Sequence, residues 1–86
     1  MLGKRVTKVL KYTVFFEPAE EGGYVVHVPA LPGCVTEGNT LEEAMEMVKD
    51  AISGYIASLK KHHEYIPEEQ GPSLMSIIDI PIQASA

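Results

Sequence analysis

The chain has 86 residues, of which 45% are apolar and 22% are charged, and its formal net charge at pH 7 is −5. This length fits one domain, and the composition excludes a wholly disordered chain. The negative charge argues against broad binding to nucleic-acid backbones, which requires a basic surface. A single cysteine, Cys34, excludes an internal disulfide. No apolar run reaches the roughly 18 residues of a membrane-spanning helix. We therefore expect one cytoplasmic domain over residues 1–86, with a loose lead over 1–8 and a tail over 83–86.

Two segments near the start of the chain have the alternating pattern of half-buried β-strands. Residues 9–16 and 24–28 are rich in β-branched and aromatic types. The second segment places Tyr24 on one face and His27 on the other. The intervening residues 17–23 contain a proline and two glycines, which predicts a β-hairpin with a longer loop.

A proline-rich corner follows the hairpin. Pro29 and Pro32 lack backbone donors, so the chain cannot continue in a sheet ladder there. Leu31 lies between these prolines, which leaves two alternatives for its side chain: a plug in the core or an exposed anchor for a partner. The corner leads into a short third strand, predicted over residues 34–37.

The strongest helix signal comes next. Thr40 and Glu43 fit a capping box, and a continuous apolar stripe follows over residues 41–59 at steps of three and four. Gly54 interrupts this pattern, and we expect close packing against the sheet to explain it, with a kink in the helix as the alternative.

A last strand is predicted over residues 76–82, with Pro81 favouring an edge position or the end of the strand. The element order is then β-β-β-α-β, which predicts a two-layer α+β domain. A small open sheet leaves unpaired backbone groups along its edges, and pairing between subunits removes them. We therefore expect a homodimer or a tetramer.

Residues 21–34 read E-G-G-Y-V-V-H-V-P-A-L-P-G-C, and residues 36–44 read T-E-G-N-T-L-E-E-A. Together they resemble the HicB antitoxin family, over roughly residues 9–60. The resemblance implies a truncated ribonuclease-H-like fold. It also implies a partner, a HicA-type toxin that cleaves mRNA and whose active surface the antitoxin covers. Only residues 83–86 follow the last predicted strand, so we expect no DNA-reading module and no direct DNA binding.

No catalytic residue is expected. The acidic residues fall in turns, at strand ends and on the helix, so a metal-dependent nuclease, which needs several converging carboxylates, is disfavoured. Residues 62–64, His-His-Glu, end the helix without enough ligands for a metal site. We expect neither a metal nor a cofactor. The candidate partner-binding residues are Tyr24, His27, Pro29, Leu31, Pro32, Glu42 and Glu46.

The leading functional hypothesis is a non-enzymatic antitoxin that uses an acidic and partly apolar face against a basic toxin. The alternative is a stand-alone oligomeric module that binds another protein or a small ligand and has no toxin partner.

Overall fold

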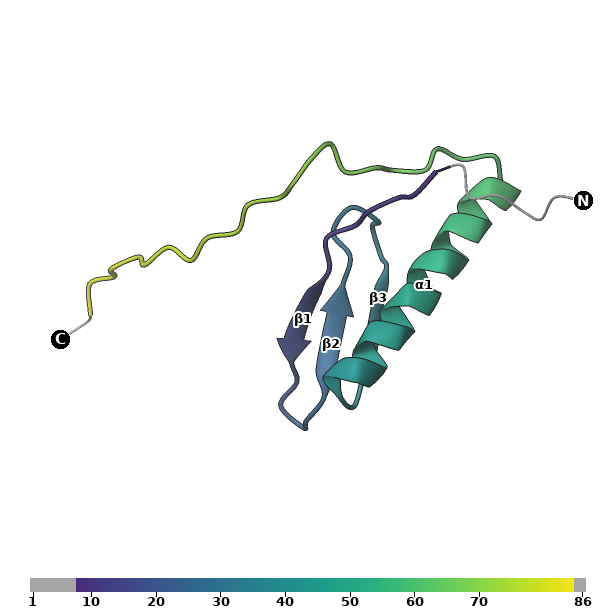
Figure 1. Cartoon of the computed structure of the whole chain (residues 1–86). Helices are drawn as coiled ribbons and strands as arrows, with labels where there is room; N and C mark the ends of the chain where they lie inside the picture. The colour runs from purple at the N-terminus through teal and green to yellow at the C-terminus, as the bar shows by residue number, and fades with distance from the viewer. Residues whose placement is uncertain (1–7, 85–86) are drawn as a thin grey trace, which may run out of the picture.

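Three antiparallel strands and one long helix form the body of the protein (Figure 1). The structure, a computed structural model, describes residues 8–84; the predicted loose lead therefore lies outside the described residues except for its last position. The elements are β1 (Phe15–Pro18), β2 (Tyr24–His27), β3 (Val35–Gly38) and α1 (Leu41–Lys61). The strands pair in the order β1-β2-β3, and α1 lies across one face of the sheet.

The strand register decides which side chains face α1. Val26 of β2 lies opposite Phe16 of β1 and Thr36 of β3, so these three residues share one face of the sheet. Val26 is completely buried, which identifies this face as the one that packs on the helix. The buried core consists of Val26, Val28, Leu31, Cys34, Ala44 and Val48.

Reciprocal side-chain bonds define the start of α1. The backbone N–H of Glu43 donates to Thr40 Oγ1 at 3.0 Å, and the backbone N–H of Asn39 donates to Glu43 Oε1 at 2.8 Å. The predicted capping box is therefore confirmed. The last turn carries Lys60 and Lys61, whose charges suit the negative end of the helix dipole.

Gly54 does not have its expected role, and a different glycine makes the close approach. Gly54 is exposed and a Cβ added there would meet nothing within 4 Å, so the prediction that it packs closely against the sheet is wrong. The close approach occurs instead at Gly38, where an added Cβ would lie 2.4 Å from Ala44 N and 2.6 Å from Ala44 Cα. Gly38 allows the end of β3 and the first turn of α1 to touch.

The three strands lie close to their predicted positions, but most of their first and last residues differ from the prediction. Residues 9–14 are not paired, and β1 begins only at Phe15, because β2 ends opposite it at His27. Val28 lies just past the end of β2, and its N–H donates to Cys34 O at 3.1 Å in the same register as the β2–β3 pairs, which closes the proline corner.

The predicted last strand is absent, so the β-β-β-α-β order is wrong in its final element, although the α+β class is confirmed. Residues 76–82 form no ladder and are exposed throughout. The segment leaves the body of the protein (Figure 1), and the molecule extends over 75 × 29 × 23 Å. Its alternating pattern marks a strand-forming segment, but pattern alone does not say which edge such a segment pairs with.

We expect Gly38→Ala to lower the free energy of unfolding by about 1–3 kcal/mol, because the added methyl group meets backbone atoms that cannot move aside easily. Gly54→Ala is the matched control and should raise stability by up to about 1 kcal/mol, as expected for an exposed helical glycine. Urea denaturation followed by circular dichroism measures both. Equal effects at the two positions would contradict the contact between β3 and α1.

Candidate functional site

Acidic side chains gather at one end of the molecule, where the β1–β2 turn lies against the β3–α1 turn. A Cβ added at Gly23 would lie 2.6 Å from Gly38 O, which shows how closely the two turns approach. A surface hollow of about 490 Å³ between them is lined in part by Glu21, Glu37 and Glu43. We call this region the acidic end; its residues are Glu20, Glu21, Glu37, Glu42, Glu43 and Glu46.

Most of the acidic end is exposed and available for contact. Glu42 and Glu46 are exposed one turn apart on α1. Glu46 lies 3.5 Å from Lys49 Nζ, and this exposed pair contributes little stability. Glu43 is partly engaged, because its carboxylate accepts the N–H of Asn39 in the helix cap.

A second surface is the face of the sheet that α1 leaves uncovered. His27 lies opposite Phe15 of β1 and Val35 of β3, and the side chain of Val35 is 54% exposed. His27 Nε2 lies 2.8 Å from Glu17 Oε1, so imidazole and carboxylate form a cross-strand pair. We call this surface the open sheet face; its residues are Phe15, Glu17, Val25, His27, Val35 and Glu37.

The candidate partner-binding residues do not form one surface. His27 lies on the open sheet face, whereas Tyr24 shares the opposite face with Val26 and packs against the core. Pro29 and Pro32 are exposed at the corner. The remaining candidates on α1 belong to the acidic end.

Leu31 is completely buried, which decides between its two alternatives in favour of a core plug. Its N–H donates to Val28 O at 3.0 Å, and its carbonyl accepts the N–H of Cys34 at 2.9 Å. Tyr55 of α1 donates its hydroxyl to Pro32 O at 2.7 Å and so ties the corner to the helix. Leu31 therefore shapes the corner from inside and offers no contact area.

Cys34 lies in the core beside this corner and is 5% exposed. Burial raises the pKa of its thiol above the ordinary value, which disfavours the reactive thiolate. The surroundings are those of a packed residue and not of a nucleophile.

Metal-ligand geometry is not found among residues 8–84, where no group of three or more His, Cys, Asp or Glu side chains is arranged to hold an ion. Within the same range, no helix is both long enough and apolar enough to cross a membrane.

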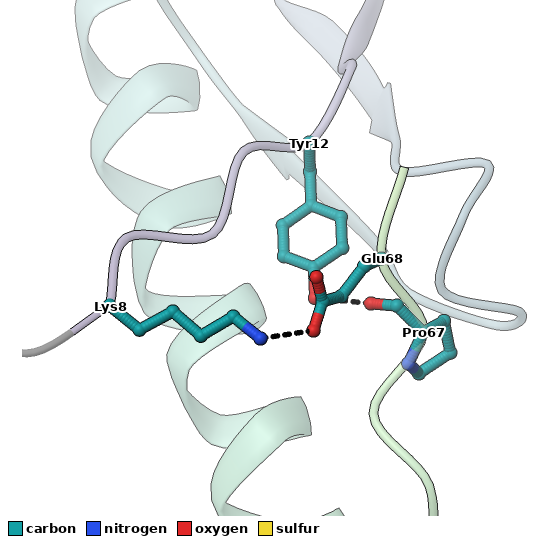
Figure 2. A network of polar contacts seen from close by, with 4 residues as sticks. All are labelled: Lys8, Tyr12, Pro67 and Glu68. Atoms are coloured by element: carbon teal, nitrogen blue, oxygen red, sulfur yellow. Dashed lines mark hydrogen bonds and ion pairs between the residues drawn. The ribbon is translucent and has the colours of Figure 1, made fainter. Parts of the chain in front are cut away.

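A polar contact network that sequence reasoning missed joins the start of the described chain to the segment after α1. Lys8 Nζ lies 2.6 Å from Glu68 Oε2, and the Tyr12 hydroxyl donates to Pro67 O at 2.6 Å (Figure 2). These contacts span 60 and 55 positions of sequence, so no local pattern signals them. We call this network the clasp; its residues are Lys8, Tyr12, Thr13, Pro67, Glu68 and Glu69.

Glu69 is the acceptor at the centre of the clasp. Its carboxylate accepts the backbone N–H of Thr13 and also the Thr13 hydroxyl, the latter at 2.8 Å. The backbone bond, followed by the hydroxyl bond, lowers the pKa of Glu69 below its ordinary value. The hydrogen bond to Glu68 raises the pKa of Lys8 in the same network.

Comparison with known proteins identifies the family. Residues 12–81 match the model of a family described as the HicB-like antitoxin of bacterial toxin–antitoxin systems, and the chain belongs to this family. A UPF0150 protein of Thermoplasma acidophilum is 52% identical over 65 residues, which cover 76% of this chain and 94% of that protein.

Several of the relatives carry the name antitoxin. Antitoxin HicB 1 of Photorhabdus laumondii is 37% identical over 81 residues, or 94% of this chain and 52% of that protein. Antitoxin HicB of Escherichia coli K12 is 40% identical over 58 residues, or 67% of this chain and 42% of that protein. The chain thus matches about half the length of the named antitoxins.

We expect the clasp to open in acid. Because the pKa of Glu69 is lower in the folded protein than its ordinary value of 4.5, the bonds contribute fully above that value and are lost as the pH falls through the folded pKa. The amide resonance of Thr13, followed by NMR between pH 6 and pH 2, should shift with the titration of Glu69. In the control Glu69→Gln this acid transition should vanish. A Thr13 resonance unchanged by either treatment would contradict the clasp.

Proposed function

We propose that this protein is a non-enzymatic antitoxin that binds a HicA-type toxin in the cytoplasm and covers its mRNA-cleaving surface. The observation that carries this proposal is the family match over residues 12–81, which includes the sheet, the helix and most of the segment after them. The antitoxin names of two relatives support the same role.

The charge distribution supplies a physical reason for such a complex. HicA-type toxins are basic by the family resemblance, and this chain carries a net charge of −5. The acidic end concentrates carboxylates from two turns and the first part of α1, whereas Lys8, Lys11, Lys60 and Lys61 lie toward the opposite end. Complementary fields of this kind accelerate encounter and orient the partner.

A stable complex also needs apolar contact, because charge complementarity contributes more to the association rate and the orientation of the partner than to the affinity. The open sheet face supplies exposed Val35 and the half-buried Phe15 and Val25 next to Glu37, which also belongs to the acidic end. A basic toxin that contacts the acidic end is thus adjacent to an apolar surface. Pro29 and Pro32 add a rigid, exposed corner.

The second candidate function is a stand-alone oligomeric module without a toxin. It is favoured by one observation: the relative that is 52% identical carries a family name without a stated role, and the named antitoxins are about twice as long as the matched region.

Charge reversal on α1 tests the antitoxin proposal. With the product of the adjacent reading frame as the binding partner, Glu42→Lys and Glu46→Lys should each weaken the complex by about 10-fold or more, with most of the change in the association rate, because a repulsive charge then faces a basic surface. The control Glu64→Lys makes the same change on an exposed residue just beyond the other end of α1 and should leave affinity unchanged.

Calorimetry gives the affinity, stopped-flow mixing gives the rate, and rescue of toxin-arrested growth gives the function. Equal weakening by all three variants would show that net charge, and not the acidic end, determines binding. A folded toxin that neither binds the unaltered protein nor is neutralised by it would leave the stand-alone module as the better description.

A further inference from the structure

The segment after the clasp is the largest exposed apolar feature of the described chain. Six of its side chains are between 72% and 97% exposed. Soluble monomers rarely expose contiguous apolar area above a few hundred Å², so a feature of this kind marks an interaction site. We call residues 74–82 the apolar tail; its exposed side chains are Leu74, Met75, Ile77, Ile78, Ile80 and Ile82.

The apolar tail has the pattern of a strand without a partner. In an extended chain Ile78, Ile80 and Ile82 point to one face, while Ile77 and Asp79 point to the other. β-Branched side chains favour this conformation. One face is therefore apolar enough to be buried, and the other carries a charge suited to water.

The sheet offers a matching acceptor at the outer edge of β1. Among the described residues 8–84, β1 pairs only with β2, so the backbone groups on its other side have no ladder partner there. Residues 9–14 lead into β1 as a non-ladder segment of strand-type composition, in which the Thr13 N–H is already bonded to Glu69 of the clasp. Such edges bind extended chains by strand addition.

A basic side chain distinguishes the β1 side from the other free edge. Lys11, exposed in the lead to β1, complements Asp79 of the apolar tail. Each outer strand carries one acidic residue, Glu17 in β1 and Glu37 in β3, but the Glu17 carboxylate already lies 2.8 Å from His27 Nε2.

We propose that the apolar tail of one copy of this protein pairs as a strand along the β1 edge of a second copy, and that the exchange is reciprocal. A two-fold arrangement uses the same patches on both subunits and closes the assembly at a dimer. It buries both apolar tails and removes one free edge from each sheet. The proposal does not depend on the toxin.

The clasp explains why the second copy, and not the same chain, accepts the tail. Glu69 is held by Thr13, and Ser73 Oγ lies 3.3 Å from Thr13 Oγ1, so the chain is anchored as far as Ser73, the residue directly before the apolar tail. Beyond that point it runs away from its own sheet (Figure 1). The anchored base directs the tail outward, toward a neighbouring molecule.

Sedimentation equilibrium of the full chain tests the exchange. The unaltered protein should be a dimer at micromolar concentration. Ile80→Asp should raise the dimer dissociation constant by at least about 100-fold, because it places a charge on the buried face. Ile77→Asp makes the same change on the face that already carries Asp79 and should alter the constant by less than about 3-fold. A monomeric unaltered protein, or equal effects of the two variants, would overturn the proposal.

Cross-linking identifies which molecule accepts the tail. Two proteins of different size, one with Lys11→Cys and the other with Asp79→Cys, are mixed and treated with a short bismaleimide; buried Cys34 stays in place, and the protein without added cysteine gives the background. Exchange predicts a cross-linked species that contains both proteins. A double variant that cross-links within one chain, with no mixed species, would show return to the same sheet and overturn the proposal.

Discussion

The contact between α1 and the inner face of the sheet is the interaction on which the rest of the structure depends. Ala44 and Val48 of the helix meet Val26 of the central strand, and all three are at most 2% exposed. Burying valine-sized side chains contributes about 1.5–3 kcal/mol each, so a six-residue core leaves little surplus. The close approach at Gly38 and the capping box position α1 for this contact, and Leu31 completes the core from the proline corner.

A single helix covers only one face of a sheet, and the consequences for function follow from that geometry. The open sheet face and both outer edges remain without a partner within residues 8–84. The two turns that bring β3 to α1 also gather the carboxylates of the acidic end. The packing of α1 on one face of the sheet thus leaves three surfaces of different chemistry: the acidic end, the apolar part of the open sheet face beside it, and the free edge of β1.

Local signals in the sequence were sufficient for the hairpin, the third strand and the helix, because their causes are local. The bond from the Glu43 N–H to Thr40 joins neighbours three positions apart, and strand alternation shows within a few residues. The clasp and the apolar tail depend on pairings about 55 positions apart or on another molecule, which no local pattern specifies. The surroundings of Gly54 and Leu31 could not be predicted for the same reason. Whether each residue is buried depends on which parts of the chain lie against it in the folded protein.

The arrangement allows the protein to hold two partners at once. The acidic end lies at the start of α1, whereas the clasp and the base of the apolar tail lie near the other end of the helix (Figure 1). A toxin at the acidic end and a second copy at the β1 edge therefore approach from different sides, and they share little surface other than the open sheet face. Because the family match extends to residue 81, the apolar tail belongs to the matched unit and not to an appendage. A dimer built through that tail would present two acidic ends, so that each subunit engages its own toxin.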